Sequence, residues 1–484
     1  MRDEHFMTEY EIRRYLDASD EKGGPVMACI NGECYKSVGE AHNIFLGMTG
    51  SGKTLMGITC MIFTFILSKA KESFICVDPK GDIYRNTSSI AKKNGYDVRL
   101  VSYRDVLHSE GFNPLWVPYQ LYTSKDPSDR QRSFDLIADI GYALYPDEKG
   151  VDPFWNQSAR ALFTATCLTL FREGAPEEIN IPSLYSIIAL GGERVLGSTV
   201  LKEYVNKLPG NRADKLLYQT YINAPSDTAL SIRAVYLNGL YHYITNEGMK
   251  AMTGNDSLKI LQMDDRRPLA LYIVIPDESM AYSVQASMLC NQLILHFIHL
   301  AQERSNGTLS RRLNVVLEEL ASIGTSLPNL PHLMAAERSR NIRVHCVLQD
   351  IKQLNTLYGE SNASTIRNNA DILMFRLRNY ETLKEFSQLC GNRIIHLSGG
   401  SDVVEPLVME TQLAQLATGQ ALMIYNRHKL ISKIPYYGDI FDLSNWSEPK
   451  PYPALSTRPV MVYKLPNPQA DRKAISSMPG FLNP

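Results

Sequence analysis

The sequence predicts an α/β protein with a mostly parallel, doubly wound sheet and a largely helical insertion. Three observations support this prediction: a glycine-rich turn between an apolar strand and an apolar helix, repeated alternation of apolar strands with helical stretches, and a run of helix-period segments over 124–251. With 484 residues, 44% of them hydrophobic, the chain can bury a large core and form two or three domains.

The first 42 residues open with the polar stretch "MRDEHFMTEYEIRRYLDASDEKGG", which lacks the apolar core of a secretory signal. We expect the segment 1–42 to join the sheet domain and to contain no transmembrane helix. The eight cysteines show neither the CxxC pairs nor the histidine spacing of a zinc site, so we expect them to be reduced thiols.

The next element is a phosphate-binding pattern in the stretch "HNIFLGMTGSGKT". Gly47, Gly52, Lys53 and Thr54 fit G-x-x-x-x-G-K-[ST], in which glycines let backbone N–H groups surround the phosphates of a nucleotide. We expect Lys53 to reach the β and γ phosphates of ATP and Thr54 to ligate Mg²⁺. The predicted nucleotide-binding residues are Gly47, Thr49, Gly50, Ser51, Gly52, Lys53 and Thr54.

The apolar run 55–67 follows this turn and can be interpreted as a membrane anchor or as a buried helix. It is too short for a bilayer, which needs roughly 20 apolar residues, whereas a helix beneath a parallel sheet is apolar nearly all round. The order strand, glycine-rich loop, helix is also the one that a P-loop requires. The buried helix is therefore the better interpretation.

Further along, apolar strands recur as "SFICVD", "GYDVRLVSY", "PLALYIVIP", "RLNVVLEEL", "IRVHCVLQD", "ADILMFRL" and "QALMIYNRHKLISKIPYY". They predict a nucleotide-binding domain made of 43–123 and 252–440. The region 124–251 between them is predicted to be an all-α domain. The Pro-rich remainder, 441–484, is predicted to be irregular.

Hydrolysis of a nucleotide also needs a carboxylate at the end of a neighbouring strand, and "LNVVLEEL" ends in Glu318 and Glu319. Glu319 is the candidate general base. Gln349 ends the strand "NIRVHCVLQD", and its amide is a candidate sensor of the attacking water or the γ phosphate. Arg338 and Arg340 precede that strand and are candidates for an arginine that acts on a neighbouring subunit's nucleotide.

Taken together, these residues resemble the type IV secretion coupling proteins, the hexameric ATPases of bacterial conjugation of the TraG and TraD kind. The resemblance runs from about Asn43 to about Tyr437. Besides the P-loop, the motifs that support it are "DPKGD" at 78–82, "FNPL" at 112–115, "DPFWNQSARALF" at 152–163, "APSDTALSI" from 224, "EELASIGTSLPNL" from 318 and "LQDIKQLNTLYG" at 348–359.

The resemblance implies a RecA-like P-loop NTPase with an inserted all-α domain that contacts the relaxase and its bound DNA strand. It implies Glu319 as the catalytic acid and Gln349 as the sensor, and it favours Arg338 over Arg340 as the trans-acting arginine. This chain has Glu318 where the family usually has Asp, so Glu318 is expected to hold Mg²⁺ with a different geometry or through water. It also lacks, before Asn43, the pair of membrane helices that family members usually carry.

The implied function is an ATP-hydrolysing coupling protein that drives relaxase-bound single-stranded DNA into a type IV secretion channel. Its partners would be single-stranded DNA, the relaxase, the channel proteins and further copies of itself, as a hexamer when active or a monomer in isolation. The 50 basic and 51 acidic residues nearly cancel, so its DNA contacts must be local.

We expect a soluble chain at the cytoplasmic face of the bacterial inner membrane. Two other functions remain open from the sequence. One is a double-stranded DNA translocase of the FtsK kind, and the other is a docking module that binds nucleotide and cargo but hydrolyses little.

Overall fold

The computed structural model describes residues 3–147, 150–195, 197–276, 282–323, 327, 329–396, 402–455 and 459–466. The chain divides into two compact units. The first, here called the sheet unit, comprises Met1–Arg104 and Met263–Tyr452, and the second, the helical unit, comprises Asp105–Gln262 and Pro453–Pro484. The division lies at 105 rather than at 124, and the Pro-rich segment after 440 is shared between the two units.

The sheet unit is built on one large sheet whose strands, in the described part of the chain, follow the order β15-β14-β11-β3-β10-β9-β4-β8-β5. The strands from β11 to β5 are parallel to their neighbours, and β14 and β15 are antiparallel. Each coincides with an apolar run that predicts a strand. Their bounds are β3 His42–Leu46, β4 Ser73–Asp78, β5 Asp97–Ser102, β8 Leu269–Val274, β9 Leu313–Leu317, β10 Ile342–Leu348, β11 Ala370–Met374, β14 Gln420–Tyr425 and β15 His428–Lys433.

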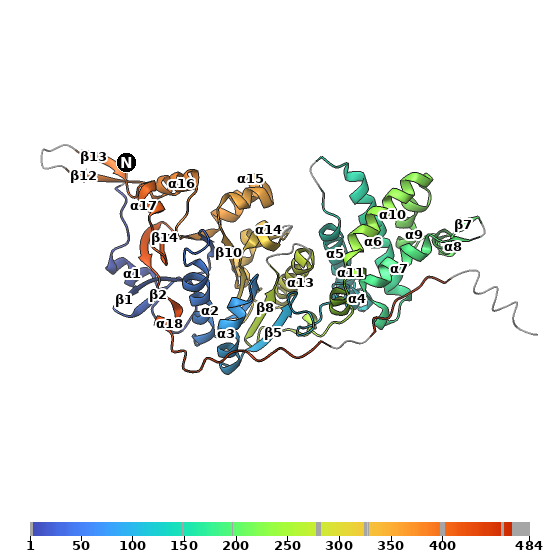
Figure 1. The fold of residues 1–484 in the computed structure, drawn as a ribbon, viewed down its shortest axis with the longest axis horizontal. Coiled ribbons are helices and arrows are strands. Elements are labelled where there is room, and N and C mark those ends of the chain that lie inside the picture. Colours follow the sequence, from blue (N-terminus) through green and yellow to red (C-terminus); the bar gives the residue numbers. More distant parts are fainter. Residues whose placement is uncertain are drawn as a thin grey trace, which may run out of the picture. The chain divides into compact units, whose positions relative to one another are not determined.

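Helices cover both faces of this sheet. Figure 1 shows α2 (Thr59–Leu67) and α3 (Asp82–Lys93) on one side, with α13 (Ser283–Gln302) and α14 (Leu330–Ala336) on the other. The central strands β3, β4, β8, β9 and β10 are buried along their whole length, which is why their sequences are continuous apolar runs rather than alternating ones. Helix α15 (Lys352–Asn368) leads from β10 to β11.

The apolar run after the glycine-rich turn forms a buried helix, as predicted. Residues 53–58 form a π-helical turn that continues into α2, and every residue of Thr59–Ile66 is buried. This burial against the sheet explains the apolar character of the run. None of the helices in the described ranges is both long and apolar enough to cross a membrane.

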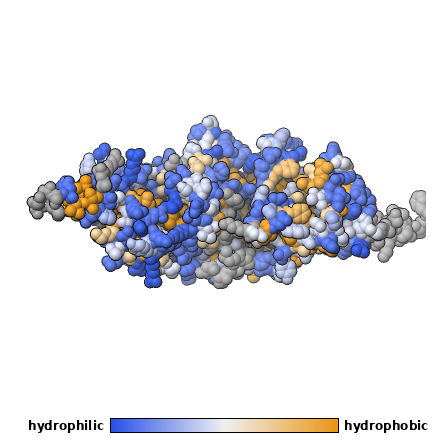
Figure 2. Space-filling view, turned by 90° about the horizontal axis from the view of Figure 1, so that it is seen from above, coloured by the Kyte–Doolittle hydropathy of each residue, from blue (hydrophilic) through white to orange (hydrophobic). Residues whose placement is uncertain are grey.

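Two hairpins of the sheet unit do not follow from the apolar pattern. One pairs β1 (Val26–Ile30) with β2 (Glu33–Lys36) and carries a disulfide between Cys29 and Cys34, so the expectation of reduced thiols is wrong for this pair. The disulfide joins directly paired residues across the hairpin, a spacing that no zinc or CxxC pattern reveals. The other hairpin pairs β12 (Asn392–His396) with β13 (Asp402–Pro406), and its apolar side chains Val403 and Val404 are exposed. Figure 2 shows a hydrophobic patch on the surface at the end where Figure 1 places this hairpin.

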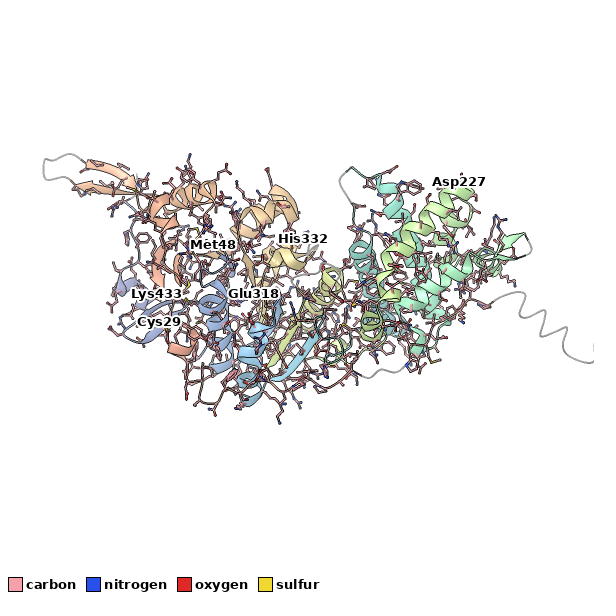
Figure 3. The ribbon with its side chains drawn as sticks, in the orientation of Figure 1. Cys29, Met48, Asp227, Glu318, His332 and Lys433 are labelled. Atoms are coloured by element: carbon pink, nitrogen blue, oxygen red, sulfur yellow. A yellow bond between two sulfur atoms is a disulfide. The ribbon has the colours of Figure 1, made fainter. Side chains whose placement is uncertain are left out.

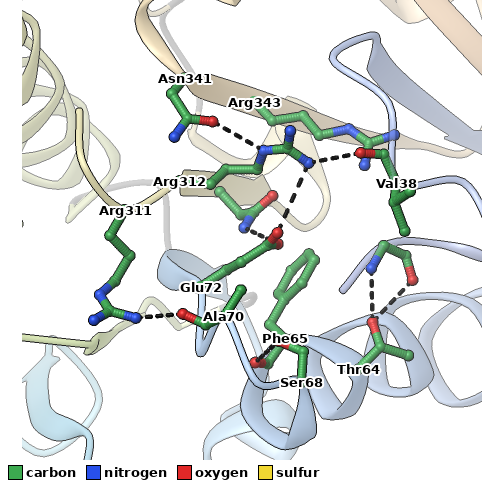
Figure 4. Close-up of polar contacts among 12 residues, drawn as sticks. Val38, Thr64, Phe65, Ser68, Ala70, Glu72, Arg311, Arg312, Asn341 and Arg343 are labelled. Atoms are coloured by element: carbon green, nitrogen blue, oxygen red, sulfur yellow. Dashed lines mark hydrogen bonds and ion pairs between the residues drawn. The ribbon is translucent and has the colours of Figure 1, made fainter. Parts of the chain in front are cut away.

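A buried polar network fixes the segment that leads into β3 (Figure 4). Arg343, at the amino end of β10, is buried, and its guanidinium donates hydrogen bonds to the carbonyl oxygens of Ala41 at 2.6 Å and Ser37 at 2.9 Å. Arg312 donates to the carbonyl oxygen of Val38 at 3.0 Å and lies 3.8 Å from the carboxylate of Glu72. The network therefore ties the amino ends of three strands to the chain just before the P-loop strand.

The helical unit is a cluster of helices around α6, whose N-terminus is formed by the "DPFW" sequence. The Asp152 side chain caps α6 by accepting a hydrogen bond from the backbone N–H of Phe154 at 3.0 Å, and Pro153 occupies its first turn. The helices of the described part of this unit are α4 Trp116–Thr123, α5 Pro127–Leu144, α6 Pro153–Glu173, α7 Ile181–Gly191, α8 Val200–Lys207, α9 Ala213–Ile222, α10 Ser226–Leu240, α11 His242–Thr245 and α12 Glu247–Thr253.

Candidate nucleotide site

The carboxyl ends of the parallel strands surround a cavity of about 520 Å³ in the sheet unit. Ligands bind at this edge of parallel α/β sheets because the strand-to-helix loops meet there. The cavity is lined by the glycine-rich loop after β3, by the loop after β4, by Glu318 and Glu319 after β9, and by Gln349 after β10. Figure 3 shows Met48 of the first loop and Glu318 near one another at this edge.

The glycine-rich loop has a conformation that depends on its glycines. Gly52 has a φ of +95°, a left-handed value that other residues rarely adopt, and a Cβ atom there would lie 2.9 Å from the backbone nitrogen of Gly419. At Gly47, a Cβ atom would lie 2.6 Å from the Ser51 hydroxyl. Both positions therefore require glycine for the loop to close.

Lys53 is fixed at the base of this loop. Its side chain is 7% exposed, and its ammonium donates a hydrogen bond to the carbonyl oxygen of Gly47 at 2.9 Å. Burial lowers the pKa of Lys53, and the carboxylates of Glu319 and Glu318 oppose that effect. A buried ammonium beside a loop of backbone N–H groups is suited to bind a phosphate.

Thr54, in the helical turn after the glycine-rich loop, and Glu318, directly after β9, form a direct pair. The hydroxyl of Thr54 donates a hydrogen bond to the carboxylate of Glu318, with 2.6 Å between the oxygens. Burial raises the pKa of Glu318 to about 7, and the negative charge of Asp78 is the second cause of this increase. The hydroxyl and the carboxylate are hard oxygen ligands of the kind that Mg²⁺ prefers, so this donor pair fits the predicted ion.

Glu319 and Gln349, which follow the strands β9 and β10, form a second pair. The amide nitrogen of Gln349 donates a hydrogen bond to the carboxylate of Glu319 at 2.8 Å. Glu319 has a φ of +51°, a backbone conformation that is costly for a residue other than glycine and that gathers at functional sites. The carboxylate of Glu319 thus faces the cavity in a fixed orientation.

The loop after β4 contributes residues to the cavity that the sequence interpretation did not assign. Pro79, Lys80 and Asp82 line it. Asp78, at the end of β4, is fully buried and accepts a hydrogen bond from the backbone N–H of Tyr84 at 2.8 Å, and burial raises its pKa to about 6. The signal in the sequence was the "DPKGD" motif directly after a predicted strand.

The predicted site residues are distributed as follows. Most of them line the same cavity: Thr49, Gly50, Gly52, Lys53, Thr54, Glu318, Glu319 and Gln349. The other two residues of the glycine-rich loop, Gly47 and Ser51, are buried within it. Arg338 and Arg340 lie in the 3-10 turn Glu337–Arg340 at the amino end of β10, away from the carboxyl end where Gln349 lies. The side chain of Arg338 lies outside the described residues. No cluster of three or more His, Cys, Asp or Glu side chains suited to a metal occurs in the ranges that the structure describes.

Comparison with solved structures shows the fold. The chain is 17% identical to the bacterial conjugative coupling protein TrwBdeltaN70 in complex with sulphate, with a TM-score of 0.67 over 93% of this chain and 96% of that one. It is 18% identical to TrwB in complex with the non-hydrolysable GTP analogue GDPNP, with a TM-score of 0.67 over 96% of this chain and 97% of that one. For TrwB in complex with ADP and Mg²⁺ the identity is 16%, the TM-score 0.66 and the coverage 93% and 96%. The predicted RecA-like P-loop fold with its inserted all-α part is confirmed.

Comparison with families of known proteins identifies the chain. No curated protein matches it. The family described as "Type IV secretory system Conjugative DNA transfer" matches residues 5–424, which include every predicted site residue. The resemblance to conjugative coupling proteins is therefore confirmed, and the chain belongs to the conjugative DNA transfer family of the type IV secretory system.

Proposed function

We propose that this protein binds ATP with Mg²⁺ and hydrolyses it to ADP and phosphate in order to move relaxase-bound single-stranded DNA into a secretion channel. The observation that supports hydrolysis, rather than binding alone, is the convergence of Lys53, Glu319 and Gln349 on one cavity. A phosphate-binding loop would suffice for binding, whereas cleavage also needs groups that orient and deprotonate water.

In this proposal the glycine-rich loop and Lys53 hold the phosphates of ATP. Thr54 and Glu318 would hold Mg²⁺, which neutralises charge on the β and γ phosphates when it is bound. Solved structures of TrwB include complexes with ADP and Mg²⁺, with GDPNP and with ADPNP, which supports a nucleotide at the equivalent place in this chain.

The chemical step uses Glu319 and Gln349. A water molecule attacks the γ phosphorus, the bond from that phosphorus to the bridging oxygen breaks, and Glu319 accepts the proton of the water. The side-chain amide of Gln349 would orient both the water and the carboxylate of Glu319. It already donates a hydrogen bond to that carboxylate at 2.8 Å. The products are ADP and inorganic phosphate.

Arg338 is proposed to act on the nucleotide of a neighbouring copy in a hexamer. It lies at the amino end of β10, and the cavity lies at the carboxyl end of that strand, which spans seven residues or roughly 23 Å. A role for Arg338 at its own chain's nucleotide is therefore disfavoured. An arginine from a neighbour would neutralise the charge that develops on the phosphates.

The helical unit is proposed to recognise the relaxase and its bound DNA strand, and the protein to work at the cytoplasmic face of the inner membrane with the channel proteins. The family match, which spans residues 5–424, supports DNA and secretion-system partners in general.

The test is phosphate release by the purified protein with ATP and Mg²⁺, with single-stranded or double-stranded DNA, and its Lys53→Ala variant. We expect the wild type to hydrolyse ATP and single-stranded DNA to stimulate this hydrolysis more than double-stranded DNA does. The Lys53→Ala variant should show neither hydrolysis nor stimulation. DNA transfer by cells that carry Lys53→Ala should fail although the variant still binds relaxase. Normal transfer with this variant would contradict the motor and favour a docking role, and stimulation by duplex DNA alone would favour a double-stranded DNA translocase.

A further inference from the structure

Lys80 lies in the cavity but has no role in the hydrolytic mechanism described above. It belongs to the loop between β4 and α3 and lines the cavity together with Pro79 and Asp82. The loop is firmly supported, because the buried carboxylate of Asp78 accepts a hydrogen bond from the backbone of Tyr84 in the first turn of α3, and Gly81 donates from its backbone to the carbonyl oxygen of Asp78 at 3.3 Å. Lys80 is therefore presented to the cavity from a rigid base.

The ammonium of Lys80 is available for a ligand. Among the described residues, none accepts a hydrogen bond from Lys80 or forms an ion pair with it. The acidic side chains that line the same cavity are engaged elsewhere: Glu318 with Thr54, Glu319 with Gln349, and Asp82 with Arg85 at 3.2 Å. The Lys80 side chain is exposed, so its charge is accessible to an anion that enters the cavity.

A second lysine faces the same space. Burial lowers the pKa of Lys53, and the positive charge of Lys80 adds to that effect, which means that the two ammonium groups are close enough to repel one another. Two cations that converge on one cavity are stabilised together when an anion lies between them. The triphosphate of the proposed substrate is such an anion.

The sheet order indicates which phosphate Lys80 would reach. The glycine-rich loop follows β3, and β10 and β9 lie between β3 and β4, so Lys80 approaches from a strand roughly 14 Å away from the P-loop strand. Glu318 and Glu319, which follow β9, lie between the two lysines in the sheet order. In the proposed mechanism Glu319 lies beside the γ phosphate, and Lys80 is on the side of Glu319 away from the glycine-rich loop. The phosphate nearest to Lys80 is therefore the terminal one.

We propose that Lys80 is a further substrate-contacting residue, whose ammonium binds the terminal phosphate of a nucleoside triphosphate from the side opposite the glycine-rich loop. A diphosphate lacks the group that Lys80 contacts, so Lys80 makes the site prefer triphosphate over diphosphate. This inference rests on the proposed function, because it takes ATP as the ligand of the cavity.

The test compares binding of ADP and of a non-hydrolysable ATP analogue, both with Mg²⁺, to the full chain by titration calorimetry. The variants are Lys80→Ala, Lys80→Arg and, as a matched control, Lys92→Ala, which removes an exposed lysine from the other end of α3. A charge-assisted hydrogen bond is worth about 1.5–3 kcal/mol, so we expect Lys80→Ala to weaken binding of the analogue by about 10- to 100-fold. ADP binding should change less than about 2-fold, Lys80→Arg should restore part of the preference, and Lys92→Ala should match the wild type.

An equal loss of affinity for both nucleotides in Lys80→Ala, or no loss for either, would overturn the role of Lys80. A wild type that binds the analogue in a Lys53-dependent manner but releases no phosphate from ATP would contradict the proposed hydrolysis and leave the role of Lys80 standing. A wild type that binds neither nucleotide would overturn both. Because Lys80 is exposed, its replacement is expected to leave the thermal unfolding of the nucleotide-free protein unchanged, which the same samples can verify.

Discussion

The side-chain amide of Gln349 donates a hydrogen bond to the carboxylate of Glu319, with 2.8 Å between the nitrogen and the oxygen. The two residues follow neighbouring strands, β10 and β9, and are 30 positions apart in the sequence. The bond orients the carboxylate that we propose as the general base. The two side chains should therefore behave as one functional unit.

We expect Glu319→Gln to lower kcat for ATP hydrolysis by about 10²- to 10⁴-fold, because a general base contributes an effect of this size. Gln349→Ala should lower kcat less, and the double variant should be no slower than Glu319→Gln, since residues that act as a unit give non-additive effects. Phosphate release in single-turnover experiments measures each rate. Multiplicative effects in the double variant would show that the two side chains act independently.

The pair of Thr54 and Glu318 predicts the dependence on Mg²⁺. We expect Glu318→Gln to raise the Mg²⁺ concentration needed for half-maximal ADP binding by about 10-fold or more, because a neutral amide is a weaker ligand than a carboxylate. Binding of ADP in the presence of a chelator should be unchanged or tighter, since a negative charge near the phosphates is lost. Titration of ADP at several Mg²⁺ concentrations separates the two effects. An unaltered Mg²⁺ dependence in Glu318→Gln would exclude Glu318 as a ligand.

The buried carboxyl groups of the site predict how the stability of the nucleotide-free protein depends on pH. Burial raises the pKa of Glu318 from 4.5 to about 7 and that of Asp78 from 3.8 to about 6. The folded state therefore binds these protons more tightly than the unfolded state, and the free energy of unfolding falls as pH rises from about 4 to about 7.

Glu318→Gln removes one of these charges. It should raise the free energy of unfolding at pH 8 by on the order of 2 kcal/mol and have little effect at pH 4. Thermal melts at the two pH values, with the exposed Glu360→Gln as a matched control, measure the difference. Stabilisation of equal size at both pH values would contradict the assigned cause.

The polar network at the amino ends of the strands predicts a stability effect outside the site. Arg343 is fully buried, burial lowers its pKa to about 10, and it donates to two backbone carbonyl oxygens, those of Ser37 and Ala41. We expect Arg343→Ala to lower the free energy of unfolding by about 3–5 kcal/mol, because the remaining buried polar groups lose their partner. Chemical denaturation measures the change. The affinity of the folded fraction for ADP should stay within about 2-fold, since the network lies at the sheet edge opposite the cavity.

Much of the fold follows from the sequence because buried parallel strands are continuous apolar runs. The strands β4, β8, β9 and β10 are recognisable as such runs, and the glycine-rich loop and the acids after β9 are placed by the strands that precede them. Local patterns therefore predict the residues on the cavity wall that follow a strand directly.

Other features depend on contacts that a local pattern does not contain. The role of Lys80 requires knowing that β4 lies beside β9 in the sheet, which is a tertiary fact. Every residue of the hairpin β12–β13 is exposed or only partly buried, so the hairpin lacks a buried apolar face to recognise. Helix α4 packs against α5 and therefore belongs to the helical unit, which begins at 105. In the sequence, helical periodicity dominates only from 124, after α4, so the sequence predicts a later start of this unit.

The position of Arg338 predicts complementation between two inactive variants. Lys53→Ala lacks a working nucleotide site but keeps Arg338, and Arg338→Ala has the reverse defect. Because Arg338 lies at the amino end of β10 and the cavity at its carboxyl end, roughly 23 Å along the strand, the arginine is expected to act only on a neighbouring copy.

Each variant alone should therefore hydrolyse almost no ATP. In a random equimolar mixture about a quarter of the interfaces should join an intact site to an intact arginine, and activity should recover in proportion. Arg340→Ala, two positions away on the same turn, is the matched control and should remain active alone. ATP hydrolysis by Arg338→Ala at the wild-type rate, or a mixture as inactive as its components, would falsify the trans-acting role.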